Sequence, residues 1–376
     1  MGITRVANVT GLDYIGIPVV MVTRPNALSL SVSQGKGLDL LMAKASGVME
    51  SIETYHAEHI EKPLRRGSYD EMARRLNLID CDLLPKLEKS LFTPNHRILW
   101  IEGHDINNNS DVWVPYELVH CDFTYPFPDG SGCFPLTSNG LASGGHLFEA
   151  ISHGICEVVE RDAVTLWKQL PLGEQHERRV DLQSIDDPDC CELMGRYDSA
   201  GIAVAIWELT SDIGLPVFLC TIIDRTPKHF ATLYSASGMG CHPSRRIAMT
   251  RALTEAAQSR LTYISGARDD ITQQRYQFSL RSDVNALLKE HLASSEGTRR
   301  FRDVPSFETD SLVEDVAVET EQLASAGFNQ VVVIDLSREE FRIPVVRVII
   351  PGLEGPDFHP ALALGDRALR ARAGQQ

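Results

Sequence analysis

The sequence predicts an α+β protein in which antiparallel or mixed β-sheets are covered by helices. Segments rich in β-branched residues and bounded by Gly, Pro, Asp or Asn indicate strands. Segments with apolar residues three and four positions apart indicate helices. Strands and helices alternate, but several strands follow one another directly, which favours antiparallel pairs within the sheets.

The elements follow in chain order. The predicted strands are residues 17–22, 98–101, 112–118, 202–209, 216–223, 331–334 and 344–350. The predicted helices are residues 38–59, 69–78, 146–170, 244–264, 283–292 and 311–326. Residues 116–129, with four aromatic residues and two prolines, are expected to form an ordered loop. Residues 268–305 are highly charged and are expected to form a mobile connection or a lid.

Composition excludes several classes of protein. The 376 residues are 43% hydrophobic and carry a formal net charge of −15, which disfavours an extended nucleic-acid surface. No apolar run is long enough to span a bilayer, and the N-terminus lacks the pattern of a signal peptide, so a cytoplasmic location is expected. The eight cysteines form no CxxC pair and predict neither a zinc site nor a disulfide framework.

Two predicted helices align carboxylates on one face. Ser46, Glu50 and Glu53 are spaced i, i+4 and i+7. On a later helix Glu149 is followed by Glu157 and Glu160, and at about 100° per residue these three fall within roughly 80° of one another. Small and apolar residues flank these carboxylates, rather than the lysines expected of a salt-bridged surface.

A third predicted helix repeats the i, i+4, i+7 spacing with Arg251, Glu255 and Gln258. Spacing alone is compatible with a solvated charged stripe, a metal site or a nucleotide site. Carboxylates three and four apart repel one another, and a cation relieves that repulsion. Magnesium is the natural candidate, because it takes oxygen ligands and fills its remaining positions with water and phosphates.

Glycine-bearing turns are expected before the first two helices, at residues 35–37 and 144–145. A helix N-terminus after such a turn offers N–H groups and a partial positive charge to an anion. Lys36 and Arg161 are candidate phosphate ligands, although each is also compatible with an ordinary surface side chain. The segment around Lys36 is not a P-loop, because the required glycine spacing and the following Ser or Thr are absent.

Four segments in order resemble YcaO-domain proteins. They are SxxxExxE at residues 46–53, the NGLASGG turn with EAxxHGxxExxER at residues 149–161, GxGCHxxxxxAxxRALTEAAQSR at residues 238–260, and the opening TRVANVTGLDYIGIPVVMVTRPN. The resemblance is close over residues 2–270 and looser beyond. We therefore expect an ATP-binding and amide-activating core in residues 1–270 and the C-terminal part of the same fold in residues 271–376.

The resemblance implies ATP and Mg²⁺ as cofactors and activation of a peptide backbone amide by O-phosphorylation. It also implies a homodimer. It assigns the following roles: metal ligands Glu53, Glu149, Glu157 and Glu160; nucleotide-binding residues Lys36, Ser46, Glu50, Arg161, Arg251, Glu255 and Gln258.

The attacking nucleophile decides the product. No proline follows Pro360, whereas azoline-forming members typically end in a proline-rich tail, and Thr54 follows Glu53 where many ring-forming members carry arginine. The N-terminal segments resemble the subgroup associated with TfuA proteins and with thioamide formation. The leading hypothesis is therefore a thioamide-forming enzyme with a TfuA-like partner and a peptide or protein substrate. An azoline- or amidine-forming enzyme and a non-catalytic nucleotide-binding accessory protein remain the alternatives.

Overall fold

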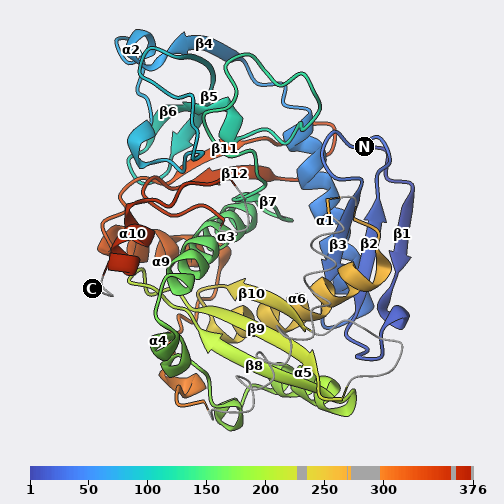
Figure 1. The fold of residues 1–376 in the computed structure, drawn as a ribbon. Coiled ribbons are helices and arrows are strands. Elements are labelled where there is room, and N and C mark those ends of the chain that lie inside the picture. The colour runs from blue at the N-terminus through green and yellow to red at the C-terminus, as the bar shows by residue number, and fades with distance from the viewer. Residues whose placement is uncertain (227–234, 269, 272–296, 357–360, 374–376) are drawn as a thin grey trace. The chain divides into compact units, whose positions relative to one another are not determined.

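Three antiparallel β-sheets and the helices packed on them make up the described part of the chain (Figure 1). The computed structural model describes residues 1–226, 235–268, 270–271, 297–356 and 361–373. All strand pairings within the described sheets are antiparallel. The predicted α+β class is therefore confirmed.

The chain divides into two compact units. Unit 1 comprises residues 1–26, 30–51 and 171–308, and unit 2 comprises residues 27–29, 52–170 and 309–376. Helix α1 (Leu40–Glu58) contributes its first part to unit 1 and its last part to unit 2. The division at residue 270 proposed from the sequence followed the motifs rather than compactness, and it remains a prediction.

The first sheet of unit 1 joins β1 (Arg5–Asn8), β2 (Val19–Thr23) and β3 (Val32–Lys36) in that order. Side chains alternate between the two faces of a strand. Val20 and Val22 of β2 accordingly pack with Ala43 of α1, whereas Val19 and Met21 pack with Leu261 of α6 (Arg245–Ser265). Strand β2 thus buries both faces, one against each helix.

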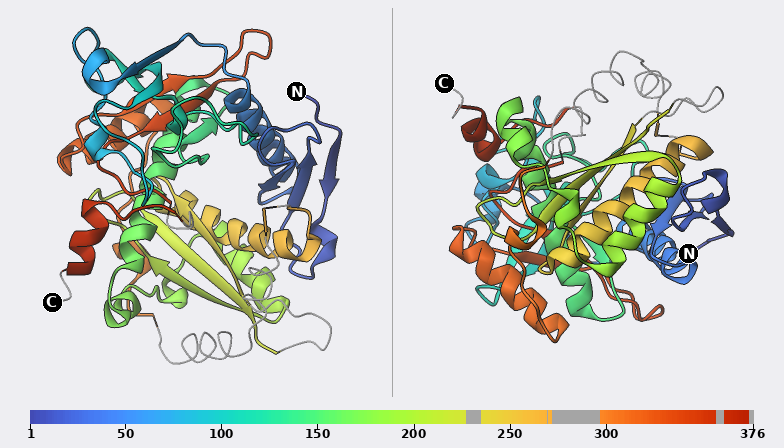
Figure 2. Two further views of the ribbon diagram at one scale, coloured as in Figure 1. Left: turned by 45° about the horizontal axis from the view of Figure 1, so that its top comes forward. Right: turned by 90° about the horizontal axis from the view of Figure 1, so that it is seen from below.

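The second sheet of unit 1 has the order β10-β9-β8, with β8 at Ile202–Glu208, β9 at Val217–Asp224 and β10 at Ser235–Cys241. Helices α5 (Pro188–Ser199) and α6 pack on this sheet (Figure 2). A Cβ at Gly240 would lie 2.1 Å from the carbonyl oxygen of Ala248. Glycine in β10 therefore permits the close approach of α6.

Unit 2 is built on a six-stranded sheet with the order β4-β5-β11-β12-β7, and β6 also pairs with β5. Helix α3 (Leu147–Lys168) packs against β12 and β7. Helices α9 (Leu312–Ser325) and α10 (Asp366–Ala373) pack against α3 in turn. The strands are β4 Leu64–Ser68, β5 Arg97–Asp105, β6 Ser110–Pro115, β7 Leu141–Ser143, β11 Val332–Asp335 and β12 Val345–Ile349.

The remaining described elements are short. They are the helices α2 Tyr69–Met72 and α4 Leu172–Glu177, and the 3₁₀ turns η1 Thr10–Leu12, η2 Cys81–Leu83, η3 Tyr116–Leu118, η4 Leu182–Ser184 and η5 Phe301–Asp303.

All seven predicted strands are present, with ends shifted by a few residues; the strand predicted at 112–118 ends at Pro115 and continues as η3. The helix predicted at 69–78 is wrong in length, because α2 ends at Met72 after one turn capped by Ser68 and Glu71. The predicted helix 283–292 and most of the predicted charged connection 268–305 lie outside the described residues. The sequence interpretation missed β1, β3, β4, β7, β10, α4, α5 and α10.

Within the described residues, no helix combines the length and apolar character needed to cross a membrane. None of the eight cysteines is in a disulfide, and all are buried except Cys191 on α5. Burial raises the pKa of the Cys81, Cys133 and Cys190 thiols to about 12, so these three remain protonated at neutral pH.

Candidate functional site

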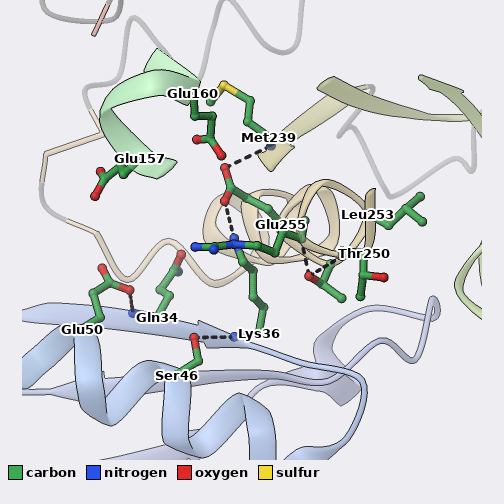
Figure 3. A network of polar contacts seen from close by, with 12 residues as sticks. Gln34, Lys36, Ser46, Glu50, Glu157, Glu160, Met239, Thr250, Leu253 and Glu255 are labelled. Atoms are coloured by element: carbon green, nitrogen blue, oxygen red, sulfur yellow. Dashed lines mark hydrogen bonds and ion pairs between the residues drawn. The ribbon is translucent and has the colours of Figure 1, made fainter. Parts of the chain in front are cut away.

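In unit 1, side chains from β3, α1 and α6 meet in one polar network (Figure 3). The ammonium group of Lys36 forms an ion pair with the carboxylate of Glu255. The other oxygen of Glu255 accepts a hydrogen bond from the backbone N–H of Met239 at 3.3 Å. The backbone N–H of Lys36 donates to Ser46 Oγ at 3.4 Å. Three predicted nucleotide-binding residues are thus connected.

Glu50 belongs to the same network. Its Oε2 accepts a hydrogen bond from the backbone N–H of Gln34 at 3.1 Å. Burial raises the pKa of Glu50, although this N–H group and the charges of Arg268 and Lys36 oppose the rise. A cation placed beside this carboxylate would stabilise its ionised form. This environment is the one expected for a residue that helps to hold a metal ion or its waters.

A close contact between strand β3 and helix α1 positions Lys36 and Ser46. A Cβ at Gly35 would lie 2.0 Å from the carbonyl oxygen of Ala43 and 2.1 Å from the backbone nitrogen of Gly47. Only glycine lets the strand approach the helix so closely. The prediction of a turn at residues 35–37 is therefore wrong in part, because residues 32–36 form a strand.

Side-chain acceptors use part of the two helix N-termini that the sequence indicated as anion sites. Asp39 Oδ1 accepts a hydrogen bond from the N–H of Met42 at 2.8 Å in the first turn of α1. His146 Nδ1 accepts the N–H of Phe148 at 3.2 Å at the start of α3. A side-chain acceptor thus already uses one N–H group at each end, and at α1 this acceptor carries a negative charge that disfavours a second anion.

Arg251, Glu255 and Gln258 share the half-buried side of α6. The intervening Ala252, Leu253, Ala256 and Ala257 are buried and belong to the core. The spacing i, i+4, i+7 therefore describes one face of α6, as predicted. Whether Arg251 and Gln258 bind nucleotide remains a prediction.

In unit 2, Arg161 forms ion pairs with two of the predicted metal ligands on α3, Glu157 and Glu160. Its Nη1 lies 3.1 Å from Glu160 Oε1, and its Nη2 lies 3.7 Å from Glu157 Oε1. All three side chains are mostly shielded from solvent, with exposed fractions of 17% for Arg161, 20% for Glu157 and 8% for Glu160. The guanidinium group compensates a carboxylate pair that would otherwise repel itself. These carboxylates are not a solvated surface stripe.

The other two predicted metal ligands have different surroundings. Glu53 is buried, and its Oε1 accepts hydrogen bonds from the backbone N–H of Ser143 at 2.9 Å and from Ser143 Oγ at 2.7 Å. Glu149 is exposed in the first turn of α3, where its Oε2 accepts the N–H of Gly145 at 2.7 Å. Ser143 was missed by the sequence analysis, although it lies within the NGLASGG motif.

The donor set fits magnesium. Every predicted ligand is a carboxylate, and hard divalent cations prefer oxygen ligands. Among the described residues, no group of three or more His, Cys, Asp or Glu side chains is arranged to hold a metal ion. The assignment of individual ligands therefore remains a prediction.

Comparison with protein families gives one match over most of the chain. Residues 34–354 match the family model described as YcaO cyclodehydratase, ATP- and Mg²⁺-binding. An uncharacterised protein in the tfuA 3′ region of Rhizobium leguminosarum bv. trifolii is 37% identical over 383 residues, covering 100% of this chain and 89% of that protein. An uncharacterised protein of Methanothermobacter thermautotrophicus is 34% identical over 367 residues, an alignment that covers 94% of this chain and 90% of that protein.

Solved structures show the same fold. The structure of YcaO from Methanopyrus kandleri bound with AMPPCP and Mg²⁺ has a TM-score of 0.70 at 25% identity, covering 94% of this chain and 86% of that chain. A heterocyclase in complex with substrate and cofactor has a TM-score of 0.75 at 23% identity, covering 94% of this chain and 50% of that chain.

Proposed function

The chain belongs to the YcaO family, whose domain binds ATP and Mg²⁺, and from this premise we propose that it activates a peptide backbone amide by ATP-dependent O-phosphorylation. We propose further that it installs a thioamide, with the help of a TfuA-like partner. The observation that carries the thioamide assignment is the 37% identity, over the whole chain, to a protein in a tfuA 3′ region. We place the reaction in the cytoplasm because ATP is its substrate.

The overall reaction balances. A peptide amide, H₂S and ATP give a thioamide, ADP and inorganic phosphate; sulfur replaces the amide oxygen, which leaves on phosphate. When bound, Mg-ATP supplies the phosphoryl group that turns the amide oxygen into a leaving group. The task left to the protein is to position the reactants and to compensate charge.

The cations of both networks suit that task. Lys36 and Arg161 are each held by carboxylates, so their positions are fixed before an anion arrives. Glu53, Glu149, Glu157 and Glu160 would hold the metal ion. Ser46, Glu50, Arg251, Glu255 and Gln258 would contact or orient the nucleotide.

Mass spectrometry of the product tests the proposal. The protein is incubated with Mg-ATP, sulfide, a TfuA-like protein and a short peptide encoded beside the gene. We expect exchange of one oxygen for sulfur, and inorganic phosphate released in equal amount. Loss of one water from the peptide would instead identify an azoline-forming enzyme, the activity for which the family model is named.

A non-catalytic accessory role is the remaining alternative. It predicts that replacing Glu157 and Glu160 by alanine abolishes ATP turnover but leaves modification of the peptide intact. The thioamide proposal predicts that both are lost together. The proposal includes a homodimer, which light scattering of the purified protein would detect as twice the mass of one chain.

A further inference from the structure

Arg347 is a buried arginine of unit 2 that has no role in the site described above. It lies in the middle of β12 and is 2% exposed. Its Nη2 donates to the carbonyl oxygen of Thr137 at 2.6 Å. Among the residues that the structure describes, its Nε and Nη1 have no hydrogen-bond partner, and no carboxylate forms an ion pair with it. Because a guanidinium group stays charged in proteins, the fold buries a positive charge that is not compensated.

The acidic groups near Arg347 do not neutralise this charge. Burial lowers the pKa of Arg347, whereas Cys121 and Glu157 raise it. Burial raises the pKa of the Cys121 thiol to about 11, so the thiol is uncharged at neutral pH. The Glu157 carboxylate lies 3.7 Å from Arg161 and compensates that cation instead. Buried charges are normally paired, because removal of an ion from water is unfavourable. An anion from solution would supply the partner that the described residues do not.

A cavity beside Arg347 has room for such an anion. Its volume is about 40 Å³, and its lining includes Arg347, Thr137, Asn139 and Val158. This volume accommodates about two or three water molecules or one small ion, and it is too small for a nucleotide. Asn139 Oδ1 is a further shielded atom without a hydrogen-bond partner in the described part of the chain. An amide side chain can turn its NH₂ group toward an anion.

The rest of the lining strengthens the field of the arginine. Most of it is apolar, with Leu118, Ile350 and Leu353 among the lining residues. In such surroundings a charge acts over several ångströms, so an ion in the cavity need not touch the shielded nitrogen atoms of Arg347. Glu354 is also on the lining, but its two carboxylate oxygens each accept a backbone N–H at 2.8 Å at the start of α10. Its charge is therefore already stabilised.

We propose that this cavity binds a small monovalent inorganic anion through the charge of Arg347. Two anions of suitable size are chloride and hydrosulfide, the ionised form of the sulfide that the proposed reaction consumes. The anion site itself is independent of the reaction, and only hydrosulfide as its occupant rests on the proposed function.

Urea titrations in three sodium salts, at one ionic strength, test the proposal. Gluconate is too large for the cavity and is the reference anion. In about 100 mM chloride, the unfolding equilibrium constant of the unchanged protein should be about 10-fold lower than in gluconate, as expected for a dissociation constant of about 10 mM. Arg347→Met keeps the length of the side chain without its charge, and it should respond equally to the two salts.

Arg97→Met is the matched control, because the Arg97 side chain is 55% exposed on another strand of the same sheet. It should respond to chloride as the unchanged protein does. If Arg347→Met also responds, or if the unchanged protein does not, the anion site is refuted and the cavity holds only water. If Arg347→Met does not fold by circular dichroism, Asn139→Asp takes its place. That variant adds a carboxylate to the lining, which should pair with Arg347 and abolish the response.

Hydrosulfide, the third salt, distinguishes the two occupants. A response equal to that of chloride, and lost in Arg347→Met, would identify hydrosulfide as a ligand. A response to chloride alone would refute it as the occupant. None of these titrations contains ATP, Mg²⁺ or peptide, so the two proposals fail separately. Absence of the thioamide product would refute the proposed function, whereas absence of the chloride response would refute only the anion site.

Discussion

Helices α3 and α6 both carry motif carboxylates on a half-buried face, but they compensate the charge differently. On α3, Arg161 pairs with Glu157 and Glu160 of the same helix. On α6, Glu255 pairs with Lys36, which lies 219 positions earlier in the chain. The first arrangement joins residues of a single helix, whereas the second joins α6 to β3 and requires the folded unit 1. The α6 network is therefore the one that depends on tertiary structure.

The buried charges of the two helices differ in another way, the number of carboxylates that each cation holds. Asp162 on α3 is held by Arg367, whose guanidinium group donates from two nitrogens at 2.9 Å. Arg260 on α6 is held by two carboxylates, Asp13 at 2.8 Å and Asp224 at 2.9 Å. Removal of Arg260 thus leaves two buried anions, whereas removal of Arg367 leaves one.

The largest expected effect is on stability. Arg260→Met leaves Asp13 and Asp224 buried without their cation, and we expect a loss of about 3–5 kcal/mol in the free energy of unfolding. Urea titration followed by circular dichroism measures it. Arg246→Met, at a position on α6 whose side chain is 51% exposed, is the control and should change little. Equal losses in the two variants would show that the buried network contributes no more to the free energy of unfolding than an exposed arginine does.

The next effect is on activity. Glu160→Gln removes the charge of the more buried member of the α3 pair and its contact with Arg161. We expect ATP turnover to fall at least about 100-fold, equivalent to about 2.7 kcal/mol, while the unfolding curve stays close to that of the unchanged protein. Glu174→Gln, at an exposed helical position on α4, should retain full turnover. Turnover unaffected by Glu160→Gln would remove α3 from the proposed site.

A pH effect distinguishes the start of α6. Burial lowers the pKa of His242 to about 4, helped by Arg251 and Arg246, and its Nδ1 accepts the N–H of Ser244 at 3.0 Å. The unfolded chain, with a histidine pKa of about 6.5, binds this proton more readily than the folded protein. The stability contribution of His242 is therefore complete above pH ~6.5 and is lost as the pH falls toward 4.

His242→Asn keeps an acceptor for Ser244 but does not titrate. Between pH 7.5 and 5, we expect the unchanged protein to lose about 1–2 kcal/mol more stability than this variant does. Urea titrations at the two pH values measure the difference. Parallel losses in both proteins would show that His242 is not the group responsible.

The smallest effect concerns the long-range pair itself. Lys36 and Glu255 have exposed fractions of 19% and 21%, so solvent screens the pair in part. A double-mutant cycle with Lys36→Met and Glu255→Gln should give a coupling free energy of about 1 kcal/mol that decreases with added salt. A cycle with no coupling would mean that the α6 network is no more dependent on tertiary structure than the α3 network.

Helical periodicity in the sequence predicted α1, α3, α6 and α9. It also predicted the group of Glu157, Glu160 and Arg161, because these residues are close in sequence as well as in space. Strands β3 and β10 were missed because each contains glycine and few of the β-branched residues that favour strands. These strands are positioned by close packing against helices: α1 contacts β3 at Gly35, and α6 contacts β10 at Gly240, where glycine has no side chain. The pattern of hydrophobic residues in the sequence does not indicate such a contact.

Two residues of the networks lay beyond sequence reasoning because their partners are distant in the sequence. The roles of Gln34 and Ser143 depend on partners 16 and 90 positions away, Glu50 and Glu53. The cap by Asp39 was readable in principle, since aspartate favours the position before a helix, whereas the cap by His146 was not, because histidine has no such preference. The start of α5 carried an equally clear signal in Asp187 followed by Pro188.

The distribution of cysteines has a practical consequence. Since Cys191 alone is exposed, a maleimide dye or spin label added to the native protein should attach at one place, on α5, with no need to remove other cysteines. The same accessibility creates an artefact: air oxidation can link two chains through Cys191 and imitate the homodimer expected of the enzyme. Light scattering should therefore be run with reductant, or on Cys191→Ser, before a dimer is accepted.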